Sequence, residues 1–178
     1  MIEDRWVESA GVRLHYLAAG SSAATPLVYV PGALGSAEQF VPEMKRLAPR
    51  RCLAISKRGL GKSSAPASGY GLADRVNDLI AVLQAADVGP ACIMAFSMGV
   101  PVAIRLAALR PDLVAGLILL DYAPRCRKID ETWFGLVMPH ASESGVPEHV
   151  VRAMVDDSKV IDLLPDLTSV RVPVLVVV

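Results

Sequence analysis

Short apolar runs alternate along this chain with longer segments in which apolar residues recur every three or four positions. The short runs are typical of buried strands, and the recurrence is that of an amphipathic helix. Strands are predicted at residues 5–9, 12–18, 27–30, 52–56, 91–96, 114–120 and 172–178, and helices at residues 36–47, 72–87 and 101–109. Because strands and helices alternate from Leu27 onward, the pattern predicts an α/β fold with a mainly parallel sheet and helices on both faces.

Residues 123–170 break this alternation. Such a stretch is long for a crossover that holds one helix, so we expect a helical lid inserted into the fold. The predicted organisation is a core at residues 1–122, the lid at 123–170, and the start of a C-terminal core portion at 171–178. Bulky lid side chains either form an apolar wall of a substrate pocket or pack only within the lid. They are Trp133, Phe134, Met138 and Met154.

The composition narrows the class of partner. The chain has 178 residues, with 18 basic and 18 acidic side chains, which suggests one domain and gives no support for nucleic-acid or anionic-membrane binding. The longest apolar stretch, residues 113–120, is too short for a membrane span. The N-terminus lacks an apolar signal segment and the three cysteines form no CxxC motif, so we expect a cytoplasmic protein with free thiols. The oligomeric state stays open.

The strongest chemical signal follows the unbroken apolar run at residues 91–96. That run is typical of a parallel strand covered on both faces, and Pro101 beyond it fits the first turn of a helix. Between them stands Ser97, with the small residues Ala95 and Gly99 two positions before and after it. A sharp strand-to-helix turn needs small residues at these places and lifts the serine hydroxyl off the sheet. The pattern therefore predicts a nucleophile.

Four short motifs follow one another along the chain. They are Val30-Pro31-Gly32-Ala33, Arg58-Gly59-Leu60-Gly61-Lys62-Ser63, the turn around Ser97, and Val172-Pro173-Val174-Leu175-Val176. In order and spacing they resemble the α/β-hydrolase superfamily, in its lid-bearing, esterase-like branch. They stand where that family has its oxyanion loop, its R-G-x-G-x-S loop, its nucleophile motif and the strand before its catalytic acid. The chain departs from the family pattern at three positions, where Pro31 replaces a histidine, Ala95 a glycine and Ser56 an aspartate.

The resemblance implies an α/β-hydrolase fold and a role for each matching residue. Ser97 would be the nucleophile, and the backbone N–H groups of Ala33 and Met98 would form the oxyanion hole that stabilises the tetrahedral intermediate. The implied function is that of a serine hydrolase that cleaves a small carboxylic ester through an acyl-enzyme. Its partner would be a small-molecule substrate, and no cofactor is implied.

The other half of a catalytic triad has no match in these residues. In the family order, the acid and then the histidine follow the nucleophile, beyond the strand that reaches Val178. We therefore expect the chain to be truncated before the last strand and helix of the fold, and to be inactive as a fragment. Within the chain, Asp121 is a candidate acid and His140 or His149 a candidate base, whereas His15 precedes the serine and is interpreted as structural.

Two other functions fit parts of the pattern. Residues 59–63 end like a phosphate-binding P-loop, but Ser56 stands where that motif needs glycine, and Pro66 follows where it needs a helix. A non-catalytic ligand-binding protein on the same fold stays open, because a fold does not determine a function. The chain has no HExxH motif and no Cys/His cluster, so no metal is expected.

Overall fold

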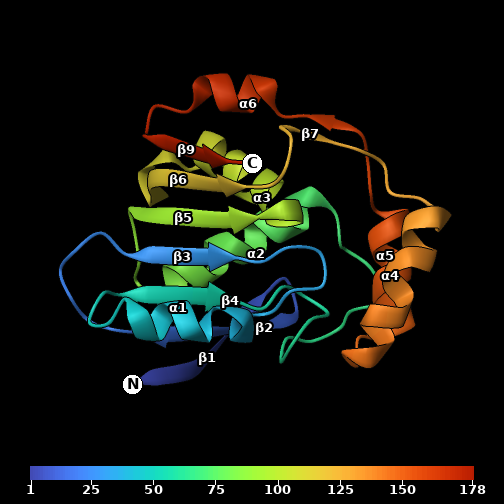
Figure 1. The fold of residues 1–178 in the computed structure, drawn as a ribbon, viewed down its shortest axis with the longest axis horizontal. Helices are drawn as coiled ribbons and strands as arrows, with labels where there is room; N and C mark the ends of the chain where they lie inside the picture. Colours follow the sequence, from blue (N-terminus) through green and yellow to red (C-terminus); the bar gives the residue numbers. More distant parts are fainter.

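The computed structural model describes all residues, 1–178. Seven strands form one sheet in the order β1-β2-β4-β3-β5-β6-β9 (Figure 1). Their bounds are Ile2–Ser9 (β1), Val12–Ala19 (β2), Leu27–Val30 (β3), Cys52–Ile55 (β4), Ala91–Phe96 (β5), Val114–Leu120 (β6) and Val174–Val177 (β9). Strands β1, β2 and β4 pair antiparallel, whereas β4, β3, β5, β6 and β9 run parallel. The predicted α/β fold with a mainly parallel sheet is confirmed.

Helices cover both faces of the sheet, and alternate residues of β3 show which helix packs on which face. Val28 and Val30 belong to the main core, together with residues of α2 (Leu72–Ala85) and α3 (Val100–Leu109). Leu27 and Tyr29 belong to a smaller core on the other face, with Met44 of α1 (Val41–Arg46). This division follows from the two-residue period of a strand, which sends successive side chains to opposite faces.

The predicted helix at residues 36–47 is divided in two. A 3-10 turn spans Ala37–Phe40, and α1 begins at Val41 with Pro42 in its first turn. Proline lacks a backbone N–H, which makes it a poor interior residue but a suitable one at the start of a helix. The segment therefore restarts as a second helix at this point.

Strand β5 is less covered than its apolar sequence predicts. Ala91, Ile93 and Ala95 are fully buried in the main core, but Met94 is only half-buried and Phe96 is 46% exposed. The prediction of a strand covered on both faces is wrong for this second face. On this face Cys92 and Met94 pack, only partly buried, against the small core that β3 and β4 share with α1.

Residues 123–170 hold three helices and a small two-stranded ladder. Helices α4 (Glu131–Glu143) and α5 (Glu148–Asp156) pack together, over a third hydrophobic cluster that includes Leu60 and Tyr70 of the loop after β4. They lie beyond the end of the sheet at which β5 finishes (Figure 1). The ladder joins β7 (Arg125–Cys126) to β8 (Ile161–Asp162), and α6 (Leu164–Ser169) packs beside α3. The division into core and lid stays a prediction.

Strand β9 lies at the edge of the sheet formed by residues 1–178. It pairs with β6 on one side only, and its four side chains are 40–58% exposed. An apolar run is typical of a strand buried on both faces, but here the side chains remain open to solvent.

Candidate active site

Ser97 stands at the bend between β5 and α3 in a strained backbone conformation. Its φ angle is +48°, and a 3-10 turn at Ser97–Gly99 joins the strand to the helix. Residues other than glycine are disfavoured at positive φ, so the surrounding packing must hold Ser97 in this conformation. The predicted sharp strand-to-helix turn is present, and it leaves the Ser97 side chain half-buried.

The loop after β3 packs directly against this bend. A β-carbon on Gly99 would lie 2.7 Å from the carbonyl oxygen of Val30 and 2.8 Å from that of Pro31, which explains the glycine two positions after Ser97. A β-carbon on Gly32 would lie 3.0 Å from the Phe96 ring and 3.4 Å from the Ser97 β-carbon. The two backbones approach so closely that side chains are excluded at both glycines. The loop that carries Ala33 is thus brought beside the serine and Met98.

A buried lysine that none of the sequence motifs marks as functional supports this loop from another side. Lys57 follows β4 and is only 6% exposed. Its Nζ atom donates hydrogen bonds to the carbonyl oxygen of Gly32 and, at 2.7 Å, to that of Ala33. Burial, and secondarily the positive charge of Arg75, lower the pKa of Lys57 well below its usual value. The only available sequence signal was a lysine placed directly after a buried strand.

Asp121 ends β6 next to the bend, with φ of +53°. Phe96 of β5 pairs with Leu120 of β6, so Asp121 follows the neighbouring strand at the height of Ser97. Its backbone N–H donates to the carbonyl oxygen of Val177 at 2.9 Å, and its side chain is exposed without a hydrogen bond to any histidine. The position suits an acid, but the structure shows no base beside it.

The three histidines make their contacts away from Ser97. His15 is fully buried and bonds Ser56 Oγ at 2.9 Å and Asp4 Oδ1 at 2.8 Å, in keeping with its structural interpretation. His140 is exposed and lies 3.9 Å from a carboxylate oxygen of Glu143. His149 lies 3.3 Å from the carbonyl oxygen of Ala65. The structure brings Ser97 and the Gly32–Ala33 loop together, but it places neither His140 nor His149 in contact with Ser97.

A cavity of about 350 Å³ adjoins the bend. Its walls come from the start of α2, the start of α3, and the segments that flank the β7/β8 ladder; they include Met98, Tyr122 and Met154. Of the four bulky side chains predicted for a pocket wall, Met154 lines this cavity. Trp133, Phe134 and Met138 do not; they pack against the third hydrophobic cluster between α4, α5 and the loop after β4.

Cationic side chains outnumber anionic ones in the walls of this cavity. Arg75, Arg127 and Lys159 line it without a carboxylate partner. The two lining carboxylates, Asp74 and Asp157, accept hydrogen bonds from backbone N–H groups. Burial lowers the pKa of Arg75, which reflects the cost of holding its charge in the wall. The cavity therefore favours a ligand that carries a negative charge.

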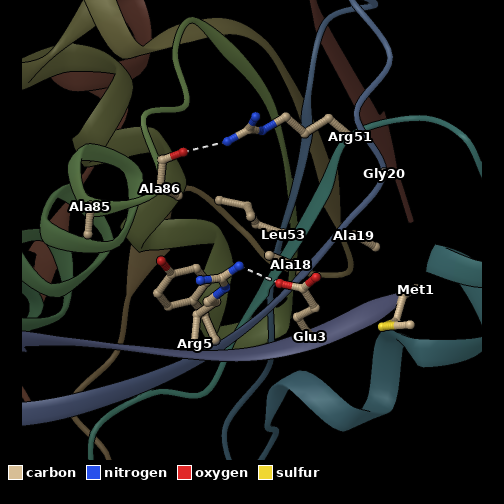
Figure 2. A pocket seen from close by; sticks show the side chains of 11 residues that line it. Met1, Glu3, Arg5, Ala18, Ala19, Gly20, Arg51, Leu53, Ala85 and Ala86 are labelled. Carbon is tan, nitrogen blue, oxygen red and sulfur yellow. Dashed lines mark hydrogen bonds and ion pairs between the residues drawn. The ribbon is translucent and has the colours of Figure 1, made fainter.

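A second hollow, of about 390 Å³, lies beside strands β1, β2 and β4. Figure 2 shows its walls, where Arg51 bonds to the carbonyl oxygen of Ala86 and Arg5 pairs with Glu3. Arg51 precedes β4, whereas Ser97 follows β5, so this hollow is at the end where the parallel strands begin. Although it is the larger of the two, it is remote from the serine.

The structure contains no group of three His, Cys, Asp or Glu side chains arranged to hold a metal ion. None of its helices combines the length and the apolar character needed to cross a bilayer. Its three cysteines are free thiols.

Residues 25–141 match the sequence profile of the family described as alpha/beta hydrolase fold. The match covers more than half of the chain, and the chain therefore belongs to the alpha/beta hydrolase family. Together with the sheet order and the serine at the strand-to-helix bend, this confirms the resemblance that the sequence motifs indicated.

Curated relatives agree with this membership, and a solved structure shows the same fold. The 2-(acetamidomethylene)succinate hydrolase of Mesorhizobium japonicum is 29% identical over 99 residues, which are 55% of this chain and 36% of that protein. The 2-hydroxy-6-oxo-6-(2'-aminophenyl)hexa-2,4-dienoic acid hydrolase of Metapseudomonas resinovorans is 27% identical over 164 residues, 89% of this chain and 56% of that protein. An esterase from Exiguobacterium antarcticum superimposes with a TM-score of 0.82 at 19% identity, covering 98% of this chain and 80% of the esterase. The chain spans about half the length, or less, of these two curated relatives.

Proposed function

We propose that the protein is a serine hydrolase that cleaves a small carboxylic ester, with Ser97 as its nucleophile. One observation carries the proposal: Ser97 is held at positive φ in a strand-to-helix bend, with the Gly32–Ala33 loop packed against it. A strained serine persists only where the surrounding structure maintains it, and such strain concentrates at functional sites. The family membership and the relatives named as hydrolases support the same chemistry.

In the proposed reaction, Ser97 Oγ forms a bond to the ester carbonyl carbon while its proton passes to a base. The backbone N–H groups of Ala33 and Met98 stabilise the negative charge on the carbonyl oxygen, which is worth roughly 3 kcal/mol for each donor. The alcohol then leaves with the proton, and an acyl-enzyme remains. Water attacks the acyl group, releases the carboxylic acid and restores the Ser97 hydroxyl.

The base in this proposal is a histidine outside residues 1–178, because the contacts of the three histidines within them lie away from Ser97. The adjoining cavity, of about 350 Å³, is in the size range of small-molecule sites. Its unpaired cationic residues suit an ester that bears a carboxylate, and two relatives are named for acid-bearing substrates. The three free thiols favour the reducing cytoplasm as its location.

The test uses the complete protein and a fluorophosphonate probe, which reacts covalently with an activated serine. The wild-type protein is expected to be labelled, and Ser97→Ala to lose labelling while it keeps its melting temperature. Ser144→Ala is the matched control, since Ser144 is exposed at the end of α4 and should leave labelling unchanged. Equal labelling of wild type and Ser97→Ala would refute the assignment. A wild-type protein that binds esters but turns none over would instead favour the non-catalytic ligand-binding alternative.

A further inference from the structure

Lys57 makes an unusual set of contacts for a buried lysine. Its side chain has no carboxylate partner, and both hydrogen bonds of its amine go to backbone carbonyls of one loop, those of Gly32 and Ala33. The neighbouring Lys62 behaves in the ordinary way, being exposed and paired with Asp4. Burying an amine costs free energy unless hydrogen bonds compensate for the lost water. The two hydrogen bonds to these carbonyls are therefore the interactions that compensate for the burial of the Lys57 amine.

The first of these carbonyls belongs to the peptide group that joins Gly32 to Ala33. In a planar trans peptide, the C=O and N–H bonds point in opposite directions. A donor that holds the Gly32 carbonyl thus sets the direction of the Ala33 N–H, which the proposed mechanism uses in the oxyanion hole. The second hydrogen bond, to the Ala33 carbonyl, holds the next peptide group as well and limits rotation about Ala33.

We infer that Lys57 is a positioning residue that orients the Ala33 N–H toward the oxyanion formed at Ser97. This inference rests on the proposed function, because it concerns the same site. Gly32 lies against Phe96 and Ser97, while Lys57 holds the carbonyl oxygens of the same loop. The loop is therefore held at two places, and a donor so fixed needs little reorganisation when negative charge develops.

The chemistry of an amine suits this task in either protonation state. Two carbonyl oxygens need two N–H donors, and a lysine amine keeps at least two whether it is charged or neutral. Burial favours the neutral form, which matches the two acceptors without an unpaired charge. A methionine of similar length fills the same space but donates no hydrogen bond.

The experiment compares Lys57→Met with Lys62→Met in the complete protein, using ester hydrolysis and inhibition by a trifluoromethyl ketone. This ketone forms a tetrahedral adduct that places an oxyanion in the hole. Lys57→Met is expected to lower kcat about 10- to 100-fold with KM changed less than about threefold. Affinity for the ketone should fall in proportion to kcat, while affinity for the carboxylic acid product stays unchanged. Lys62→Met should match the wild type in all four quantities.

A purely structural role for Lys57 predicts a different pattern. Product affinity, ketone affinity and melting temperature would then decline together, and that result would overturn the inference. So would an unchanged kcat in a folded Lys57→Met protein. If Lys57→Met fails to fold, Lys57→Gln replaces it; its amide keeps two donors on a shorter stem that reaches the loop less well. If the Ala33 amide signal shifts in that variant while kcat and ketone affinity stay unchanged, the inference is equally contradicted.

One measurement separates this inference from the proposed function. The Ala33 amide is followed by NMR, through its ¹⁵N–¹H shift and its hydrogen-exchange rate, in wild type and Lys57→Met. A shift and faster exchange at Ala33, but not at a distant amide such as Leu79, are expected. If wild type proves inactive while the Ala33 amide responds, the proposed function fails and the positioning contact stands. An unaltered Ala33 amide refutes the positioning role itself.

Discussion

Arg58 and Asp78 form a buried, two-pronged ion pair that joins the loop after β4 to helix α2. The Arg58 Nε atom lies 2.7 Å from Asp78 Oδ2, and an Nη atom lies 2.7 Å from Oδ1. The two side chains are 5% and 7% exposed. Arg58 also donates to the carbonyl oxygen of Gly69, so one guanidinium links α2 to both ends of the loop between β4 and α2. The arginine of the R-G-x-G-x-S motif is thus a structural clamp.

Asp78→Ala should therefore destabilise the protein strongly. Removing one partner of a buried pair leaves an uncompensated charge, which typically costs about 3–5 kcal/mol in the free energy of unfolding. Urea denaturation measures the change. Asp112→Ala is the control, because the Arg110–Asp112 pair is exposed and screened by water, so its loss should change the midpoint little. Equal midpoint shifts for the two variants would contradict a clamping role.

Much of the fold could be predicted because its signals are local. Strand β5 and helix α2 begin where the apolar pattern of residues 91–96 and 72–83 predicts, since each pattern depends only on neighbouring residues. The location of β9 in the sheet does not depend on neighbouring residues alone. Its aliphatic run indicates a strand but not which neighbours it has, and pairing with β6 alone leaves it exposed at an edge.

The site divides in the same way. The bend at Ser97 could be predicted because a tight turn needs small residues at positions 95 and 99 of the sequence itself. The contact of Lys57 with the Gly32–Ala33 loop could not be predicted, because a lysine that follows a buried strand resembles an exposed one until this loop folds over it. Contacts between distant segments are invisible to a local pattern.

Gly99→Ala should disturb the bend through a steric clash. The new methyl group would lie 2.7 Å from the Val30 carbonyl oxygen and 2.8 Å from that of Pro31, and neither backbone atom can move freely. Overpacking of this kind typically costs about 1–3 kcal/mol. The control is Gly135→Ala within α4, where no atom lies within 4 Å of the added carbon. That change should stabilise the protein by about 0.5–1 kcal/mol. Thermal unfolding that shifts both variants in the same direction would show the packing argument to be wrong.

Ser97→Gly should make the protein more stable than Ser97→Ala. Glycine accepts positive φ readily, whereas alanine keeps the strain that serine has at φ of +48°. The expected difference in unfolding free energy is about 1 kcal/mol, measured by denaturant titration of the two variants. Since both substitutions remove the hydroxyl, their difference reports the relief of backbone strain less the extra entropy that glycine loses on folding. Equal stabilities would mean that the strain does not exceed this entropic loss.

Leu175→Lys should reduce self-association of a protein made of residues 1–178 alone. Leu175 is 56% exposed on β9, whose outer edge presents unpaired backbone groups beside aliphatic side chains. A charge on such an edge opposes pairing with a second chain. Leu109→Lys is the control, since Leu109 is 61% exposed but lies at the end of helix α3. Light scattering should show a larger decrease for the β9 variant, and an equal decrease would point to general hydrophobicity instead of an open edge.

The stability of the wild-type protein relative to Lys57→Met should rise with pH on the alkaline side of neutrality. Burial, reinforced by the nearby Arg75, lowers the pKa of Lys57 in the folded protein, whereas the unfolded chain keeps its ammonium up to about pH 10.4. Between those two pKa values the unfolded state binds more protons, so raising the pH favours folding by at most about 1.4 kcal/mol per pH unit. Above about pH 10.4 both states are neutral and the difference levels off. Lys62 provides the contrast, because its hydrogen bond to Asp4 raises its pKa. The difference in unfolding free energy between wild type and Lys62→Met should therefore stay flat or fall as the pH rises. Urea denaturation of the three proteins between pH 7 and 10 measures how the difference in unfolding free energy between wild type and each variant changes with pH. If this difference does not change with pH for Lys57→Met, the buried amine stays charged.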